Sequence, residues 1–133
     1  MSTGSQTSST GFAISYQNGS PFVAVSSTTK QIGGSNVVTM PTGRWVNLSI
    51  TFNNTTPTLN YYINGTLSQS SWAAAGASSY TAAYPNLTLG VPNNALGSYQ
   101  FNGYISHLSI WSRELSATEV ALNFSALKSR HGV

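Results

Sequence analysis

The chain has 133 residues, of which five are Lys or Arg and two are Glu, so its formal net charge is +3 and only 5% of it is charged. The length suits one domain with a two-layer core, and no apolar run approaches the roughly 20 residues that cross a membrane, so membrane insertion is not expected. The basic residues are scattered, which argues against a nucleic-acid partner, and the absence of cysteine excludes disulfides and thiolate chemistry. We therefore expect a neutral polar surface, a composition suited to packing against copies of itself.

The first ten residues are almost entirely Ser, Thr, Gly and Gln. Such a composition cannot bury enough apolar area to offset the entropy of ordering, so residues 1–10 are predicted to be a flexible polar arm and residues 11–133 the folded domain. The arm has neither the basic nor the apolar region of a signal peptide.

A first hairpin is predicted directly after the arm. Apolar residues alternate with polar ones from Phe12 to Tyr16, Asn18-Gly19 supplies a tight turn, and alternation resumes at Phe22. After it, residues 30–36 are predicted to be a loop and residues 37–40 a short strand.

The central hairpin has the clearest strand pattern. Apolar residues alternate over residues 46–52 and again over residues 59–63, and Asn64-Gly65, a dipeptide that tolerates positive φ, closes the far end. The Ala-rich stretch 68–85 loses the alternation and is predicted to be a long loop, and residues 86–91 a further strand.

The last part of the chain is predicted to be paired strand followed by helix. Between residues 101 and 111 the apolar positions change from odd to even, so a β-bulge near Ser106-His107 would restore one face. Ser116 and Glu119 form a capping box, bracketed by the staple pair Leu115 and Val120. One apolar face of the helix, made by Val120, Phe124 and Leu127, is expected to dock on a sheet.

Two motifs carry a resemblance to a known family. The Trp that opens the central hairpin and the Leu-x-Tyr-Ile-Asn-Gly strand ending at Gly65 resemble the laminin-G-like, concanavalin A-like jelly roll, and so do residues 101–105 followed by residues 108–116. The resemblance implies an all-β fold: an antiparallel two-sheet jelly-roll sandwich with one short C-terminal helix. Trp45 and Trp111 are assigned to strands in its core. Strands that usually precede the matched region are replaced here by the arm, so an open sheet edge is expected, which a neighbouring subunit or its exchanged arm would complete.

Catalysis and metal binding are not expected. Glycoside hydrolysis usually needs two carboxylates, yet Glu114 and Glu119 are the only two in the chain, and Glu119 already serves the capping box. Calcium prefers several carboxylate oxygens, and His107 and His131 fall short of a zinc set. No cofactor is predicted.

Glycan binding stays open, because neutral sugars need only aromatic faces and neutral polar groups. The candidate contacts to a glycan or a partner are the aromatic residues in or beside the Ala-rich loop, namely Trp72, Tyr80, Tyr84, Tyr62 and Tyr99. The alternative is that these rings pack the loop down or form a subunit contact.

The functional hypothesis is a non-catalytic structural protein on the outside of a virion, such as a head decoration or a tail or fibre component. The C-terminal residues 123–132 resemble laminin-G-like copies in phage and large-virus structural proteins. Its expected partners are copies of itself, other virion proteins and neutral glycans, and its expected location is a virion surface or extracellular. The alternative is a lectin-like carbohydrate-binding adhesion module.

Overall fold

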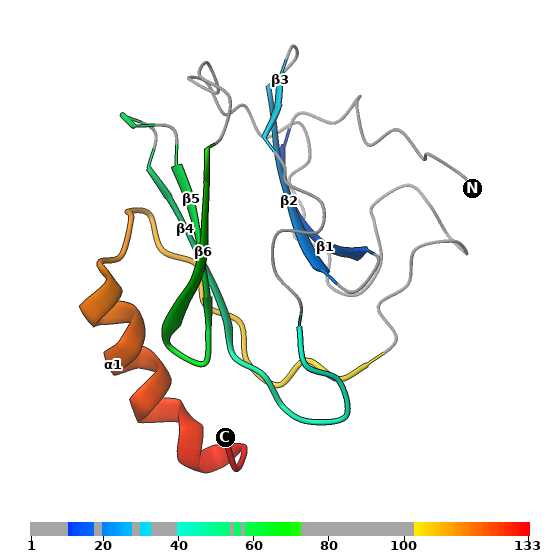
Figure 1. Ribbon diagram of the computed structural model, residues 1–133, viewed down its shortest axis with the longest axis vertical. Coiled ribbons are helices and arrows are strands. Elements are labelled where there is room, and N and C mark those ends of the chain that lie inside the picture. The colour runs from blue at the N-terminus through cyan, green and yellow to red at the C-terminus, as the bar shows by residue number, and fades with distance from the viewer. Residues whose placement is uncertain are drawn as a thin grey trace.

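The computed structural model describes residues 11–17, 20–27, 30–32, 40–53, 55–56, 58–72 and 103–133. The predicted arm, the predicted strand at 86–91 and most of the Ala-rich stretch lie outside these residues. So does the predicted strand at 37–40 except for Met40, which is not in a strand. The described elements are two three-stranded antiparallel sheets and a C-terminal helix (Figure 1).

The first sheet has the order β1-β2-β3. Strand β1 (Gly11–Gln17) pairs with β2 (Ser20–Ser27) in a register that joins Gln17 to Ser20, so the hairpin predicted across Asn18-Gly19 is confirmed. Strand β3 (Lys30–Ile32) pairs antiparallel with β2. The prediction of a loop over residues 30–36 is therefore wrong at its start, where three residues pair with β2 and extend the ladder.

The second sheet has the order β4-β5-β6 and contains the predicted central hairpin. Strand β4 (Leu48–Asn53) pairs with β5 (Thr58–Ile63), which continues through a turn into β6 (Thr66–Trp72). Asn64 and Gly65 have φ values of 49° and 76°, the positive pair that a type I′ hairpin turn requires. The predicted loop over residues 68–85 is thus wrong for residues 68–72, which are strand.

At the other end of the hairpin, one side chain organises the turn between β4 and β5. The Asn53 Oδ1 atom accepts hydrogen bonds from the backbone N–H groups of Thr55 at 2.9 Å and Thr56 at 3.0 Å. An Asn side chain that satisfies its own following backbone in this way fixes a tight turn.

Helix α1 (Ala117–Leu127) confirms the capping-box prediction and is followed by the 3₁₀ turn η1 (Lys128–Arg130). Val120 is buried and forms one core cluster with Leu115 and with Tyr62 of β5, so the helix docks on the second sheet. Figure 1 shows α1 lying beside that sheet. A Cβ atom placed on Gly65 would lie only 2.8 Å from Cδ1 of Phe124, so the helix also packs tightly against the β5–β6 turn.

The predicted pairing of residues 101–111 is wrong for the described residues from Gly103 to Trp111, none of which belongs to a strand. The burial predicted for two tryptophans is wrong for a related reason. Trp45 precedes β4 and Trp111 lies in this unpaired stretch, and both rings are exposed. Neither tryptophan lies on a strand, so no strand alternation directs its ring toward a core.

Candidate functional site

An exposed apolar segment, residues 104–111, is the most unusual surface feature in the described part of the chain. It precedes α1, and none of its residues is assigned to a strand in the described part of the chain. Its five large apolar residues are all exposed, at 87% for Tyr104, 51% for Ile105, 44% for Leu108, 63% for Ile110 and 54% for Trp111. Single exposed apolar residues are ordinary, whereas a contiguous group marks a contact surface.

One side-chain contact ties this segment to the C-terminal turn. The Ser106 Oγ atom lies 3.2 Å from Nε2 of His131, whose ring lies 5.2 Å from that of Trp45 at an interplanar angle of 45°. Within the segment, Nε2 of His107 lies 2.7 Å from Oγ of Ser109. Side chains two residues apart meet in this way when the backbone is extended. The C-terminal turn therefore fixes one side of an extended, uncharged segment.

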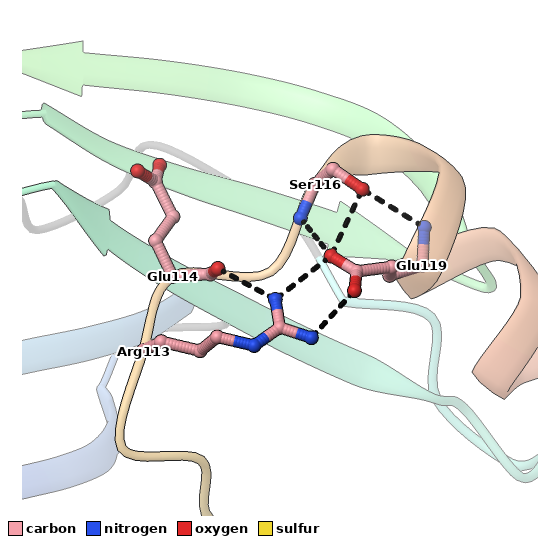
Figure 2. Close-up of polar contacts among 4 residues, drawn as sticks. All are labelled: Arg113, Glu114, Ser116 and Glu119. Atoms are coloured by element: carbon pink, nitrogen blue, oxygen red, sulfur yellow. Dashed lines mark hydrogen bonds and ion pairs between the residues drawn. The ribbon is translucent and has the colours of Figure 1, made fainter.

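A charged network follows the segment and fixes the start of α1 (Figure 2). The Arg113 guanidinium donates two hydrogen bonds to the Glu119 carboxylate, at 2.6 Å to Oε1 and 3.0 Å to Oε2. The Ser116 backbone N–H and hydroxyl also donate to Oε2, at 2.8 and 3.0 Å, while the Ser116 Oγ accepts from the Glu119 N–H at 3.3 Å. This single carboxylate therefore satisfies both the capping box and a bidentate arginine.

The hydrogen bonds of this network favour the ionised form of Glu119. Hydrogen bonds from Arg113, and then from the backbone and side chain of Ser116, lower the pKa of Glu119 to about 2. The same pairing raises the pKa of Arg113. Because both groups stay charged at neutral pH, this pair acts as an ion pair at the start of α1 and not as a proton donor or acceptor.

The other acid, Glu114, has a separate environment. Its Oε2 atom accepts a hydrogen bond of 2.7 Å from Nδ2 of Asn53, at the end of β4. Figure 2 shows its carboxylate pointing away from the pair formed by Arg113 and Glu119. The two carboxylates therefore do not converge on one space.

A hollow of about 140 Å³ lies between the apolar segment and α1. It is lined by apolar and polar side chains together, namely Trp111, Arg113, Leu115, Glu119, Leu122 and Asn123. Ligand pockets usually measure roughly 300–1,000 Å³, so this hollow has room for a single side chain or one sugar ring. Among the described residues, no group of three or more His, Asp or Glu side chains lies together.

Of the five contact residues predicted from sequence, the structure describes the side chain of one. Tyr62 is buried against Leu115 and Val120, so its assignment to an exposed contact surface is wrong: α1 covers the face of β5 on which it lies. Trp72 ends β6, but its side chain lies outside the described residues, as do Tyr80, Tyr84 and Tyr99. The structure therefore does not test those four assignments.

Sequence reasoning missed Arg113 and the exposure of the apolar segment. The signal for the segment was present in the change of apolar parity between Ile105 and Leu108, which places apolar side chains on both faces. Nothing in the sequence pattern pointed to Arg113, because its partner Glu119 is six residues away and is reached only through the turn into α1.

Comparison with known proteins identifies the fold. The family model for the concanavalin A-like lectin/glucanases superfamily matches residues 1–121. Over 75 residues, the chain is 32% identical to the human adhesion G-protein coupled receptor D1, which covers 56% of this chain and 8% of the receptor. A crystal structure of an S-layer domain-containing protein from Clostridium thermocellum aligns with a TM-score of 0.53 at 17% identity, over 86% of this chain and 64% of that one. The chain thus spans a small part of the receptor and just under two thirds of the S-layer structure.

Proposed function

Because the chain belongs to the concanavalin A-like lectin/glucanases superfamily, we propose that its two sheets pack as a jelly-roll sandwich and that it serves as a non-catalytic surface module. This superfamily name joins sugar binding with hydrolysis, so the fold alone does not choose between them. The observation that carries the proposal is the apolar segment 104–111, whose five large side chains are all exposed.

The two carboxylates support a role without catalysis. A glycosidase of the usual kind needs one carboxylic acid with a raised pKa and a second carboxylate across the scissile bond. Here the pKa of Glu119 is lowered to about 2, and Glu114 is directed elsewhere and bonded to Asn53. Glu119 is therefore ionised at neutral pH, and the two carboxylates do not face each other across one space.

The setting that fits best is the exterior of a virion, as a head decoration or a tail or fibre component. A surface with 5% charged residues allows many copies to pack without strong repulsion, and an apolar contact segment supplies the attraction. The named relatives are also surface proteins by their descriptions, an adhesion receptor and an S-layer protein, which supports an extracellular or surface location. In the described part of the chain, no helix is both long and apolar enough for a bilayer crossing.

The test is the solution mass of the purified chain across a range of concentrations, measured by light scattering after size exclusion. We expect the wild-type chain to associate and Ile110→Lys to reduce that association, because Ile110 is exposed within the segment. Leu67→Lys is the control, since Leu67 is also exposed but lies on β6, away from the hollow beside Trp111. A chain that stays monomeric at every concentration and binds no other virion protein would overturn the assembly role.

A carbohydrate-binding adhesion role is the second candidate, and the hollow beside Trp111 favours it. An exposed indole next to the Arg113 guanidinium and the Asn123 amide offers a sugar one stacking face and neighbouring hydrogen-bond donors. A glycan-binding screen with Trp111→Ala and Trp72→Ala separates this hollow from the aromatic loop predicted from sequence. Binding that is unaffected by Trp111→Ala would exclude the hollow.

A further inference from the structure

We propose that the partner of the apolar segment 104–111 is the same segment of a second copy, paired antiparallel about a two-fold axis at Leu108. This inference rests on the proposed assembly function and names the partner and the register of the contact. It follows from three features of the described residues. The segment belongs to no strand, the contact between His107 and Ser109 indicates an extended backbone, and exposed apolar side chains lie on both faces with no charge between Gly103 and Ser112.

The area of the segment is large enough for a specific dimer. If a large apolar residue exposes about 200 Å² when fully accessible, the five exposed fractions correspond to roughly 600 Å² for each copy. Two copies then offer on the order of 1,200 Å², the lower limit of stable specific interfaces. The single-residue hollow beside Trp111 is too small to accept a second protein by itself.

Charge also favours a second copy. Residues 103–112 contain no Lys, Arg or Glu, so two segments can meet without like charges facing each other. The first charge after the segment, on Arg113, is already paired with Glu119. A strongly acidic or basic partner would find no complementary charge within the segment. The arm 1–10 is also a poor match, because Met1 is its only large apolar residue.

Symmetry limits the possible registers. In an antiparallel pair, residues that face each other lie on the same side of the sheet. A two-fold axis between the strands must therefore pass midway between the two copies of one central residue. Centring on Leu108 places the two Leu108 side chains together, sets Ile105 opposite Trp111 twice and pairs His107 with Ser109. Centring on His107 instead brings two imidazoles together and leaves Trp111 opposite Gly103. Cross-strand apolar pairs favour the Leu108 register.

Engineered cysteines test the register directly, because the natural chain contains no cysteine. Directly opposed residues of an antiparallel pair have Cα atoms about 4.5–5.5 Å apart, within the range for a disulfide. Under mild oxidation we expect Leu108→Cys alone, and an equimolar mixture of Ser106→Cys with Ile110→Cys, to form covalent dimers. Ser106→Cys alone should cross-link at least about tenfold more slowly, since two Ser106 positions would lie four residues apart along the strand, roughly 13 Å.

The outcomes separate the two proposals. The register is overturned if association depends on Ile110 but these variants form no cross-link. It is also overturned if His107→Cys alone forms one. In both cases the proposed assembly function is retained. Cross-linking that disappears when residues 1–10 are deleted overturns the pairing of segments and assigns the contact to the arm. A monomeric chain overturns both proposals. Circular dichroism of each cysteine variant checks that the fold is retained.

Discussion

Replacing Gly65 with alanine measures how tightly α1 is held against the second sheet. Gly65 has φ of +76°, where an L side chain costs about 1–2 kcal/mol. The added Cβ would also lie 2.8 Å from Cδ1 and 3.0 Å from Cβ of Phe124, and overpacking of this kind costs a further 1–3 kcal/mol or so. The expected loss is therefore about 2–5 kcal/mol in the free energy of unfolding, a large part of the roughly 5–15 kcal/mol of a natural domain.

Gly43 provides a matched control for the backbone term. Its φ is +74°, nearly the same as at Gly65, but a Cβ added there would meet nothing within 4 Å. Urea unfolding followed by tryptophan fluorescence should give a loss of about 1–2 kcal/mol for Gly43→Ala, and the excess for Gly65→Ala measures the contact with Phe124. Combining Gly65→Ala with Phe124→Ala should recover the part of that excess that comes from the ring, because alanine keeps the Cβ atom at 3.0 Å. Equal losses for the two glycine variants would show that α1 does not pack against this turn.

Three further results are expected. The lowered pKa of Glu119 contributes stability that is fully present above its usual pKa of 4.5 and is lost as the pH falls toward about 2. Glu119→Gln keeps a capping-box partner and should weaken the pH dependence of the urea midpoint over this range. An unchanged pH profile would contradict the network. Ser116→Ala should destabilise the chain by about 1 kcal/mol through loss of the N-cap, seen as a lower urea midpoint, whereas Ser125→Ala on the exposed side of α1 should change it little. Tyr62→Ala should cost about 3–5 kcal/mol because the ring is buried, so a loss of ligand binding with a normal unfolding curve would restore Tyr62 as a contact residue.

Local chemistry explains which elements the sequence could predict. The turn at Asn64-Gly65 needs two positive φ values, which these residue types adopt readily. The helix start needs a hydroxyl and a carboxylate three residues apart, which Ser116 and Glu119 provide. Both features depend on neighbouring residues alone, so they could be read before any tertiary contact was known.

Burial was less predictable because it depends on what covers each face. Alternation along β5 correctly places Tyr61 inward, but it also suggests that the adjacent Tyr62 is exposed. Tyr62 is buried because α1, more than 50 residues later, supplies a second layer through Val120. A shift in the β5–β6 register at Tyr61 and Tyr62 further breaks the simple alternation. No period-two pattern within the strand carries that information.

The exposed segment 104–111 has a clear local pattern but an unpredicted exposure, and the proposed function depends on it. Its residues have the composition of a buried strand, yet from Gly103 to Trp111 none is paired in the described structure. An apolar edge of this kind is an aggregation hazard unless a specific partner covers it. Charged side chains usually protect such an edge from aggregation. This segment has none, so we expect a bound partner to cover it. A second copy that covers the segment in one register satisfies that requirement, because a closed two-fold contact uses up both edges and leaves none to recruit a third chain.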